Sequence, residues 1–238
     1  MSRVPKIIWQ TYKSIEQLPE ESLPCMDTWL RRNPEWVYHF CSDSDIEAFF
    51  HAFRAGEFLE LYRAMPMPVM KADLWRYAAL YEFGGVYADI DTTCRFPLQD
   101  WLNERVGFHV ACEMDDTFFC QWAFASAPGH PVLDRVLKLI RERVERDGGV
   151  DESMDHYVHY YTGPAVWSDA ILDYLGTRKT PNALQESKAG RHKDMVIYPT
   201  GHFGGAKITH ANGSIHWCDL PGYSSWQRQR KDYANRVI

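Results

Sequence analysis

Residues 71–95 read KADLWRYAALYEFGGVYADIDTTCR, and this stretch decides the fold. Residues 71–83 contain strong helix formers and no Gly or Pro, so they predict a helix. Gly84 and Gly85 end that helix, because glycine readily adopts the left-handed conformation found at helix C-termini. From Val86 the pattern changes to a period of two, which predicts a strand. The stretch therefore predicts a helix that turns at a glycine corner directly into a strand.

The predicted strand carries two carboxylates on one face. Its side chains alternate, with Val86, Ala88 and Ile90 pointing one way and Tyr87, Asp89 and Asp91 the other. Extended geometry separates Asp89 and Asp91 by about 7 Å, and their repulsion raises the pKa of one of them. A hard divalent cation relieves this repulsion, and Mg²⁺ or Mn²⁺ prefers oxygen ligands with a substrate phosphate completing the shell. An Asp-x-Asp pair alone also occurs as solvated acids at a strand end, but here the preceding helix adds Asp73 and Arg76 one turn apart.

This series of residues resembles the signature of glycosyltransferase family 32. Members of that family include yeast Golgi α-mannosyltransferases and bacterial and viral glycan transferases, and the same series occurs in the glucosyltransferase domains of large clostridial toxins. The resemblance rests on an Asp-x-x-Arg-Tyr series, a Gly-Gly-x-Tyr corner and the Asp-x-Asp pair, all in the same order and spacing: Asp73, Arg76, Tyr77, Gly84, Gly85, Tyr87, Asp89 and Asp91.

The resemblance implies a fold and a donor site. The fold is expected to be an α/β GT-A fold, with a mainly parallel central sheet flanked by helices and one domain over residues 1–238. Asp73, Arg76, Asp89 and Asp91 are the expected catalytic residues. Residues expected to contact the nucleotide sugar are Ile8, Trp9, Gln10 and Tyr12 of the first strand, Asp73, Arg76 and Tyr77 of the helix, Ala88, Asp89, Ile90 and Asp91 of the strand, and Ser214 and Trp226 near the C-terminus. Trp9 stands where relatives have His, and Gln121 stands where Asn is commoner.

A third metal ligand is expected from the C-terminal part of the chain. Residues 208–217 read ITHANGSIHW, and relatives close the metal and diphosphate site with a His followed by small residues. His210 fits this pattern best and is predicted to join Asp89 and Asp91, with His216 as the competing candidate. An imidazole ligand favours Mn²⁺ over Mg²⁺, so the expected cofactor is Mn²⁺, with Mg²⁺ as the alternative.

Hydrophobic periodicity predicts the remaining helices and strands, and Pro and Gly mark where they end. A turn-rich linker is expected over residues 18–24. Strands are expected over residues 4–10, 37–41, 106–113 and 196–199, and helices over 26–33, 45–53, 57–64, 131–146, 165–175 and 227–238. Asp43 is interpreted as a helix cap in preference to a nucleotide contact, since Ser and Asp are favoured at caps.

Composition excludes several classes of protein. With 238 residues and 45% hydrophobic residues, the chain has the profile of an ordinary folded domain. The net charge of −6 and the lack of a basic run argue against a nucleic-acid partner. Six cysteines without CxxC pairing indicate reduced thiols. The start MSRVPKIIWQ lacks a long apolar segment, so a cytoplasmic location is expected, with peripheral membrane contact through the basic C-terminal helix left open.

The expected function is transfer of a hexose from a UDP- or GDP-linked sugar to an acceptor hydroxyl of a glycan or glycoconjugate. The resemblance implies metal dependence and retention of the anomeric configuration. Two alternatives stay open: a metal-dependent nucleotide-sugar hydrolase, and an inactive module that binds glycans or nucleotides.

Overall fold

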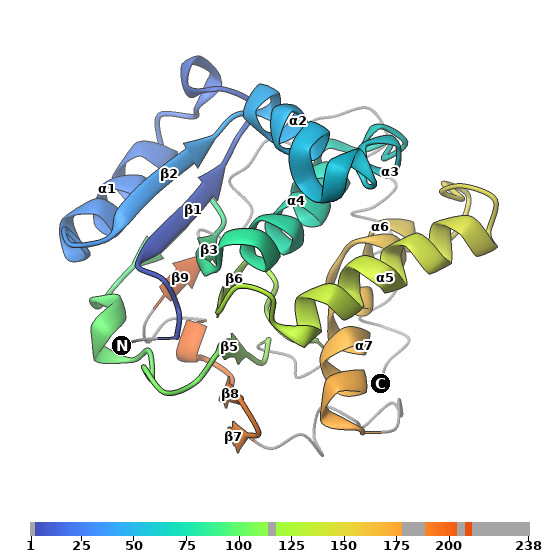
Figure 1. Cartoon of the computed structure of the whole chain (residues 1–238). Helices are drawn as coiled ribbons and strands as arrows, with labels where there is room; N and C mark the ends of the chain where they lie inside the picture. The colour runs from blue at the N-terminus through green and yellow to red at the C-terminus, as the bar shows by residue number, and fades with distance from the viewer. Residues whose placement is uncertain (1–2, 114–117, 178–188, 204–207, 211–238) are drawn as a thin grey trace.

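The computed structural model of the chain describes residues 3–113, 118–177, 189–203 and 208–210. Helices and strands alternate along the chain, and a seven-stranded sheet runs through the centre (Figure 1). The strands are β1 (Ile7–Thr11), β2 (Val37–Cys41), β3 (Gly85–Ala88), β4 (Thr92–Cys94), β5 (Phe108–Ala111), β6 (Ala123–Ser126), β7 (Gly190–His192), β8 (Met195–Tyr198) and β9 (Ile208–His210). The α-helices are α1 (Ser22–Arg32), α2 (Asp43–Ala52), α3 (Leu59–Arg63), α4 (Pro68–Phe83), α5 (Pro131–Arg146), α6 (Tyr157–Tyr161) and α7 (Pro164–Leu175), and the 3₁₀ turns are η1 (Ile15–Gln17), η2 (Phe53–Gly56) and η3 (Leu98–Asp100).

The sheet is mixed and has the order β2-β1-β3-β6-β5-β8-β7. β1 pairs in parallel with β2 and β3, and β5 pairs in parallel with β8, while β6 and β7 run antiparallel to their neighbours. The chain passes from β1 outward to β2 and then returns to β3 on the other side of β1. Such a reversal of strand order opens a crevice at the carboxyl ends of the strands, where ligands bind in open α/β sheets.

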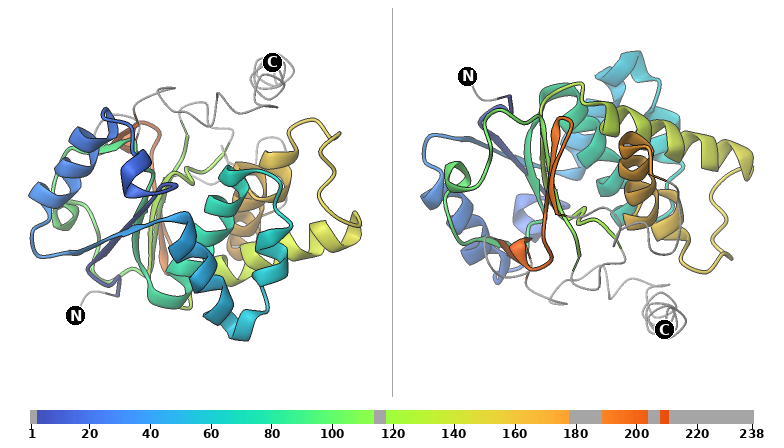
Figure 2. Two further views of the ribbon diagram at one scale, coloured as in Figure 1. Left: turned by 90° about the horizontal axis from the view of Figure 1, so that it is seen from above. Right: turned by 90° about the horizontal axis from the view of Figure 1, so that it is seen from below.

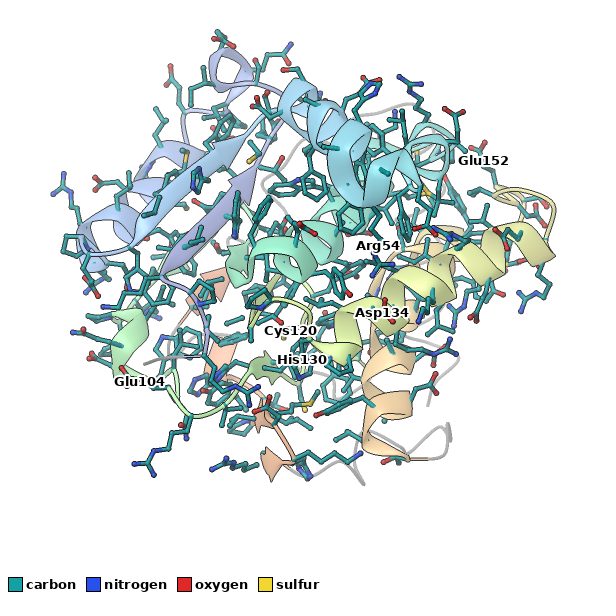
Figure 3. All side chains as sticks on the ribbon, in the orientation of Figure 1. Arg54, Glu104, Cys120, His130, Asp134 and Glu152 are labelled. Carbon is teal, nitrogen blue, oxygen red and sulfur yellow. The ribbon has the colours of Figure 1, made fainter. Side chains whose placement is uncertain are left out.

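Two layers of hydrophobic side chains cover the two faces of the sheet. Trp9, Tyr87 and Phe124 pack against α2, α4, α5 and α7 on one face. Ile8, Val86 and Ala123 pack against α1, η3 and the segment around Phe203 on the other. Figure 2 shows the sheet between α1 on one side and the larger helical layer on the other, and Figure 3 shows side chains filling both layers, with His130 at the start of α5. The α/β class expected from the sequence is confirmed.

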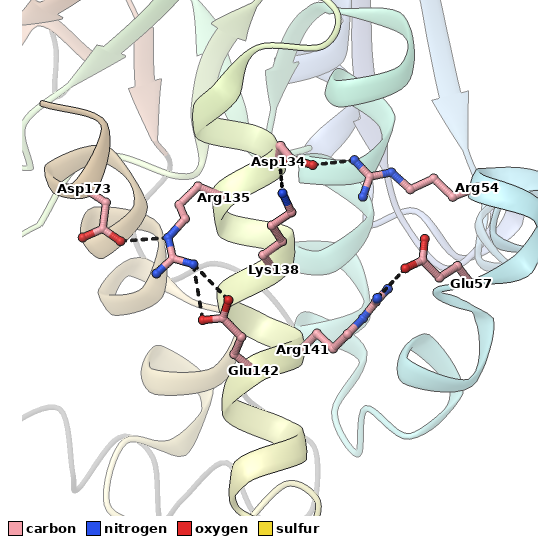
Figure 4. A network of polar contacts seen from close by, with 8 residues as sticks. All are labelled: Arg54, Glu57, Asp134, Arg135, Lys138, Arg141, Glu142 and Asp173. Atoms are coloured by element: carbon pink, nitrogen blue, oxygen red, sulfur yellow. Dashed lines mark hydrogen bonds and ion pairs between the residues drawn. The ribbon is translucent and has the colours of Figure 1, made fainter.

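Ion pairs on the outer side of the helical layer connect α5 to its neighbours (Figure 4). Asp134 of α5 lies 2.7 Å from Arg54 of η2 and 2.6 Å from Lys138. Arg135 donates to Asp173 of α7 at 2.8 Å, and Arg141 pairs with Glu57. These groups are at least partly exposed, so each pair contributes at most about 1 kcal/mol.

The most important correction concerns the strand that carries the Asp-x-Asp pair. β3 ends at Ala88, and Asp89, Ile90 and Asp91 form a turn in which the Thr92 amide donates to the Asp89 carbonyl at 3.1 Å. The alternation predicted for the strand therefore holds for Val86, Tyr87 and Ala88 and stops there. Because Asp89 and Asp91 are not in an extended strand, the 7 Å estimate does not apply.

Other boundaries differ because Pro and Ser begin helices. α4 starts at Pro68, three residues before the predicted start, since proline is well suited to the first position of a helix. α1 starts at Ser22, within the segment expected to be a linker. Ser42 caps α2, and its hydroxyl accepts from the Asp45 amide in a capping box, so Asp43 is the first helical residue and the cap interpretation of Asp43 is wrong.

The predicted strand over 37–41 and the predicted helix over 131–146 coincide with β2 and α5. The five described cysteines are free thiols, and Cys218 lies outside the described residues, as does the predicted helix over 227–238. Within the part of the chain that the structure describes, no helix is long and apolar enough to cross a bilayer.

Candidate active site

Arg76 lies at the centre of a buried cluster of charges beyond the carboxyl end of β3. Its side chain projects from α4 and is 5% exposed. Nη2 lies 3.2 Å from Asp73 Oδ1 and 3.2 Å from Asp89 Oδ1, and Nη1 donates to the Gln121 carbonyl at 3.0 Å. Burial opposes the charge of Arg76, but Asp89, Tyr87 and Asp73 outweigh it and raise the guanidinium pKa. Arg76 therefore remains a cation that connects the helix to the Asp-x-Asp turn.

Asp73 is fully buried and is fixed from two sides. Thr162, which directly precedes the Gly-Pro start of α7, donates from its hydroxyl to Asp73 Oδ2 at 2.9 Å. Asp73 Oδ1 lies 3.2 Å from Arg76 Nη2 and forms an ion pair with it, but the geometry of this contact is not that of a hydrogen bond. Burial raises the pKa of Asp73 to about 7, although Arg76 and the Thr162 hydrogen bond both oppose the rise. The carboxyl group thus has one oxygen satisfied by the fold and one that faces the cluster.

Asp89 is oriented by the strand that precedes it. The Tyr87 hydroxyl donates to Asp89 Oδ1 at 2.5 Å, and the Arg76 guanidinium stacks 4.5 Å from the Tyr87 ring centroid. Burial raises the pKa of Tyr87, so its hydroxyl keeps the proton that it donates. The backbone of Asp89 is held as well, because Gln10 Nε2 and the Thr92 hydroxyl both donate to its carbonyl.

Asp91 lies in the same turn, and the residue is 9% exposed. The turn leads directly into β4, which pairs with β9 in a separate two-stranded sheet. In this pairing Thr92 is opposite His210, so the backbone of His210 lies beside the residue that follows Asp91. This register describes the backbone only, and the role of His210 as a metal ligand stays a prediction.

The structure also positions Tyr77 and Gln121 beside the cluster. The Tyr77 hydroxyl lies within hydrogen-bond distance of the Gln121 side-chain carbonyl and 3.0 Å from the Thr162 carbonyl. Tyr77 stacks on Trp167 of α7 with ring centroids 5.0 Å apart. The helix α7 and the segment before β6 are thereby joined to α4 around Arg76.

The expected nucleotide contacts of the first strand are mostly interior. Ile8 is 1% exposed and Trp9 8%, and the Trp9 indole donates to the Gly84 carbonyl at 2.9 Å while its ring stacks on His39. Gln10 is buried between the Tyr38 hydroxyl and the Asp89 carbonyl. Ala88 is buried, Ile90 is 6% exposed, and Tyr12 is partly exposed just beyond the end of β1. Their contacts with a nucleotide remain predictions.

The C-terminal site residues Ser214, His216 and Trp226 lie outside the described residues. Among the side chains that are described, no three His, Cys, Asp or Glu residues form a group able to hold a metal ion. The oxygen donors of Asp89 and Asp91 nevertheless suit Mg²⁺ or Mn²⁺, whose remaining ligands in such sites are waters and substrate phosphates.

Sequence reasoning missed two residues of this cluster. The sequence pattern does not single out Thr162, and Tyr87 enters only as one position of the motif. Both donate to site carboxylates, and only the three-dimensional packing brings Thr162 across 89 residues to Asp73.

Comparison with known proteins agrees with this geometry. The sequence model of the family described as glycosyltransferase sugar-binding region containing DXD motif matches residues 19–107. An uncharacterized glycosyltransferase of Acanthamoeba polyphaga mimivirus is 30% identical over 189 residues, which cover 78% of this chain and 72% of that protein. The chain belongs to glycosyltransferase family 32.

Other relatives of this family 32 member include fungal mannosyltransferases. The initiation-specific alpha-1,6-mannosyltransferase of Schizosaccharomyces pombe is 30% identical over 205 residues, covering 76% of this chain and 51% of that protein. The chain spans about half the length of the first fungal relatives that it matches. Among solved structures, the PaToxG glycosyltransferase superposes with a TM-score of 0.56 at 18% identity, covering 73% of this chain and 70% of that one. This likeness confirms the GT-A fold.

Proposed function

We propose that this family 32 member transfers a hexose from a nucleotide sugar to an acceptor hydroxyl of a glycan or glycoconjugate, with the help of a divalent metal and with retention of configuration. The observation that carries the proposal is the buried Asp73–Arg76–Asp89 cluster joined to the Asp89–Asp91 turn at the crevice of the sheet. A buried, paired guanidinium is expensive to maintain for structure alone. The family membership and the mannosyltransferase relatives support the same activity.

Metal binding is assigned to Asp91 and Asp89, with His210 as the third protein ligand. A bound Mn²⁺ or Mg²⁺ would neutralise the diphosphate of the donor and stabilise negative charge as it leaves. Neighbouring residues orient Asp89 for this role. Tyr87 and Arg76 contact its side chain, and Gln10 and Thr92 donate hydrogen bonds to its carbonyl.

Arg76 and Asp73 are assigned to the donor sugar. The planar guanidinium offers several N–H groups to sugar hydroxyls, and the Asp73 carboxylate accepts from them. Burial of both groups keeps water from competing for these hydrogen bonds. The two side chains would therefore hold the sugar ring in one orientation above the turn.

The chemical step that we propose is a front-face displacement. The bond from the anomeric carbon to the diphosphate oxygen breaks while the acceptor oxygen bonds to the same face of that carbon. The departing phosphate oxygen takes the acceptor proton, so a nucleoside diphosphate and a retained glycoside are the products.

The experiment that tests the proposal is calorimetric titration with UDP-glucose, UDP-galactose, UDP-N-acetylglucosamine and GDP-mannose in the presence of Mn²⁺, repeated for Asp91→Ala. We expect one donor to bind only with metal, and the variant to lose that binding. Release of free sugar without an acceptor would instead favour the hydrolase. If no donor binds, or if Asp91→Ala binds the donor as tightly as the wild-type chain does, the transferase proposal is wrong. The inactive module that binds glycans or nucleotides is then the better hypothesis.

A further inference from the structure

Thr162 lies in the short corner between α6 and α7 and contacts two residues of α4. Both short helices belong to the helical layer beside α5 (Figure 1). The Thr162 hydroxyl donates to Asp73 Oδ2 at 2.9 Å, and its carbonyl accepts from the Tyr77 hydroxyl at 3.0 Å. Asp73 and Tyr77 are four positions apart, so they lie on one face of α4. Thr162, which is itself buried, therefore joins the corner to the cluster around Arg76.

The surroundings of the Thr162 hydroxyl decide where its single hydrogen points. The alternative acceptor is the Val158 carbonyl, which lies 3.5 Å away. That carbonyl already accepts from the Thr162 amide at 3.1 Å and from the Gly163 amide at 2.7 Å. The Asp73 carboxylate is nearer and carries charge, and charge makes it the stronger acceptor. The hydroxyl therefore donates to Asp73.

The backbone on both sides of Thr162 holds it in place. Gly163 follows it, and a Cβ on Gly163 would lie 2.8 Å from His159 Cα and 2.9 Å from the Val158 carbonyl oxygen. The corner is thus in direct contact with the backbone of α6. Pro164 then begins α7. The position of the hydroxyl is therefore set by the backbone of two helices.

A row of contacts leads from Thr162 to the side chain of Asp89. While Thr162 holds Oδ2 of Asp73, the other oxygen, Oδ1, lies 3.2 Å from Arg76 Nη2. The same Nη2 lies 3.2 Å from Asp89 Oδ1. The exposed fraction of the side chains rises along the row, from 0% for Asp73 to 5% for Arg76 and 25% for Asp89. The row thus begins in the interior and ends at the Asp-x-Asp turn.

We infer that Thr162 is a positioning residue that acts through Asp73 and Arg76 on the Asp-x-Asp turn. Without the hydroxyl, the Asp73 carboxyl group is free to rotate, and Arg76 loses the contact that holds Nη2 beside Asp89. Residues that orient a metal-binding side chain without touching the metal change the metal affinity by about 10–100-fold. The inference rests on the proposed function, in which the turn binds a divalent metal and the metal binds the diphosphate.

The test is calorimetric titration with UDP and with GDP in the presence of Mn²⁺. These probes lack the sugar that is transferred, so they report on the metal and diphosphate site alone. Thr162→Val keeps the size of the side chain and removes the hydroxyl. We expect this variant to bind about tenfold more weakly than the wild-type chain does, with whichever nucleoside diphosphate the wild-type chain binds. Thr162→Ser restores the hydroxyl and should restore most of the affinity.

Ser168→Ala is the matched control. Ser168 of α7 is also buried, and its oxygen accepts from the Phe119 amide at 3.0 Å, a bond that is not part of the row leading to Asp89. Ser168→Ala should lower the melting temperature and leave the affinity for the nucleoside diphosphate unchanged. A thermal melt identifies a Thr162→Val chain that does not fold. Thr162→Cys then replaces it, because a thiol is a weak donor and should also weaken binding.

The outcomes separate this inference from the proposed function. If the folded Thr162 variant binds as tightly as the wild-type chain, if Ser168→Ala weakens binding as much, or if Thr162→Ser does not restore it, Thr162 only supports the fold. The inference is then overturned while the transferase stands. A loss confined to the sugar-linked donor also overturns it, because the hydroxyl then acts on the sugar and not on the turn. If neither nucleoside diphosphate binds the wild-type chain with Mn²⁺, the proposed function fails and the inference fails with it.

Discussion

At the scale of the residue, Arg76 determines how the site is held together. One guanidinium lies between the carboxylates of Asp73 and Asp89 and over the ring of Tyr87. Asp73, Arg76 and Tyr87 are buried and the Asp89 side chain is 25% exposed, so the charge of each group depends strongly on the others. Removing the cation alone should therefore lower the free energy of unfolding more than removing both partners of an ion pair does.

The first prediction concerns Arg76→Met. The substitution leaves Asp73, which is fully buried, without its cation, and should lower the free energy of unfolding by about 3–5 kcal/mol. Urea denaturation measures the loss. Adding Asp73→Asn removes the uncompensated charge and keeps an acceptor for Thr162, so the double variant should be more stable than Arg76→Met. A double variant that is less stable than the single one would contradict this account.

The second prediction concerns His130, which caps α5. Its Nδ1 accepts from the Val132 amide at 3.3 Å, and its ring stacks on Phe108, so the folded protein holds it neutral. Burial lowers the pKa of His130 to about 4, below its ordinary value of 6.5. The stability that depends on neutral His130 is complete above pH 6.5 and is lost as the pH falls toward 4, because the unfolded chain takes up the proton first.

His130→Asn keeps a cap acceptor and removes the titration. Between pH 7 and pH 4 the wild-type protein should lose up to about 3 kcal/mol more unfolding free energy than the variant, as a shift of this size implies. Chemical denaturation at the two pH values gives the difference. His109, whose pKa burial also lowers to about 4, is unchanged in both proteins and cancels from the comparison. Equal losses in both proteins would mean that His130 does not carry this dependence.

At the scale of the element, the glycine corner between α4 and β3 sets the direction of the strand. Gly84 and Gly85 have φ values of 67° and 108°, which L-residues rarely adopt. The corner is also crowded, since a Cβ on Gly85 would lie 2.6 Å from the Ile7 carbonyl oxygen of β1. The same corner that ends the helix thus allows β3 to pair closely with β1.

The third prediction separates strain from crowding with two alanine variants. Gly85→Ala has both an unfavourable φ and a clash with backbone, so it should cost more than about 2 kcal/mol of stability. Gly148→Ala, at φ 71° after α5 with nothing within 4 Å of the added Cβ, should cost only about 1 kcal/mol. Thermal or urea unfolding of both variants provides the measurement. Similar costs would show that contact with β1 is unimportant.

At the scale of the whole molecule, the strand order brings the segments of the candidate site together. The reversal from β2 to β3 around β1 brings the Asp-x-Asp turn, the start of α2 and the start of α4 to one edge of the sheet. The pairing of β4 with β9 adds a segment from more than 100 residues later in the chain. Metal and nucleotide are expected to bind where these segments meet, and binding to the folded state alone stabilises the fold.

The fourth prediction follows from that linkage. Mn²⁺ together with the nucleoside diphosphate of whichever donor binds, at about 100 times its dissociation constant, should raise the unfolding free energy by about 2.7 kcal/mol, whereas Mn²⁺ alone should raise it far less. A chelator should reverse the gain. Asp91→Ala should remain folded and show no gain from the nucleotide, which differential scanning fluorimetry at several nucleotide concentrations checks. A full gain in the variant would remove Asp91 from the metal site.

Local chemistry in the sequence determined the elements and the residue types of the site. Helix formers, the Gly-Gly corner and the change of period predicted α4 and β3, because these depend on neighbouring residues alone. The Asp-x-Asp pair with Asp73 and Arg76 identified the family, and the donor site that these residues predict stays a prediction. The alternation of side chains did not predict the turn over Asp89–Asp91. The Asp89 carbonyl accepts hydrogen bonds from the Thr92 amide and from Gln10, and neither bond can be predicted from a period of two.

Tertiary structure alone decided how those residues are joined. Thr162 reaches Asp73 across 89 positions, and Gln121 meets Arg76 across 45. The same packing placed Trp9 against His39 and Gly84. Such contacts arise from the strand order and the burial of both faces of the sheet, and neither is encoded by the spacing of residues within one segment.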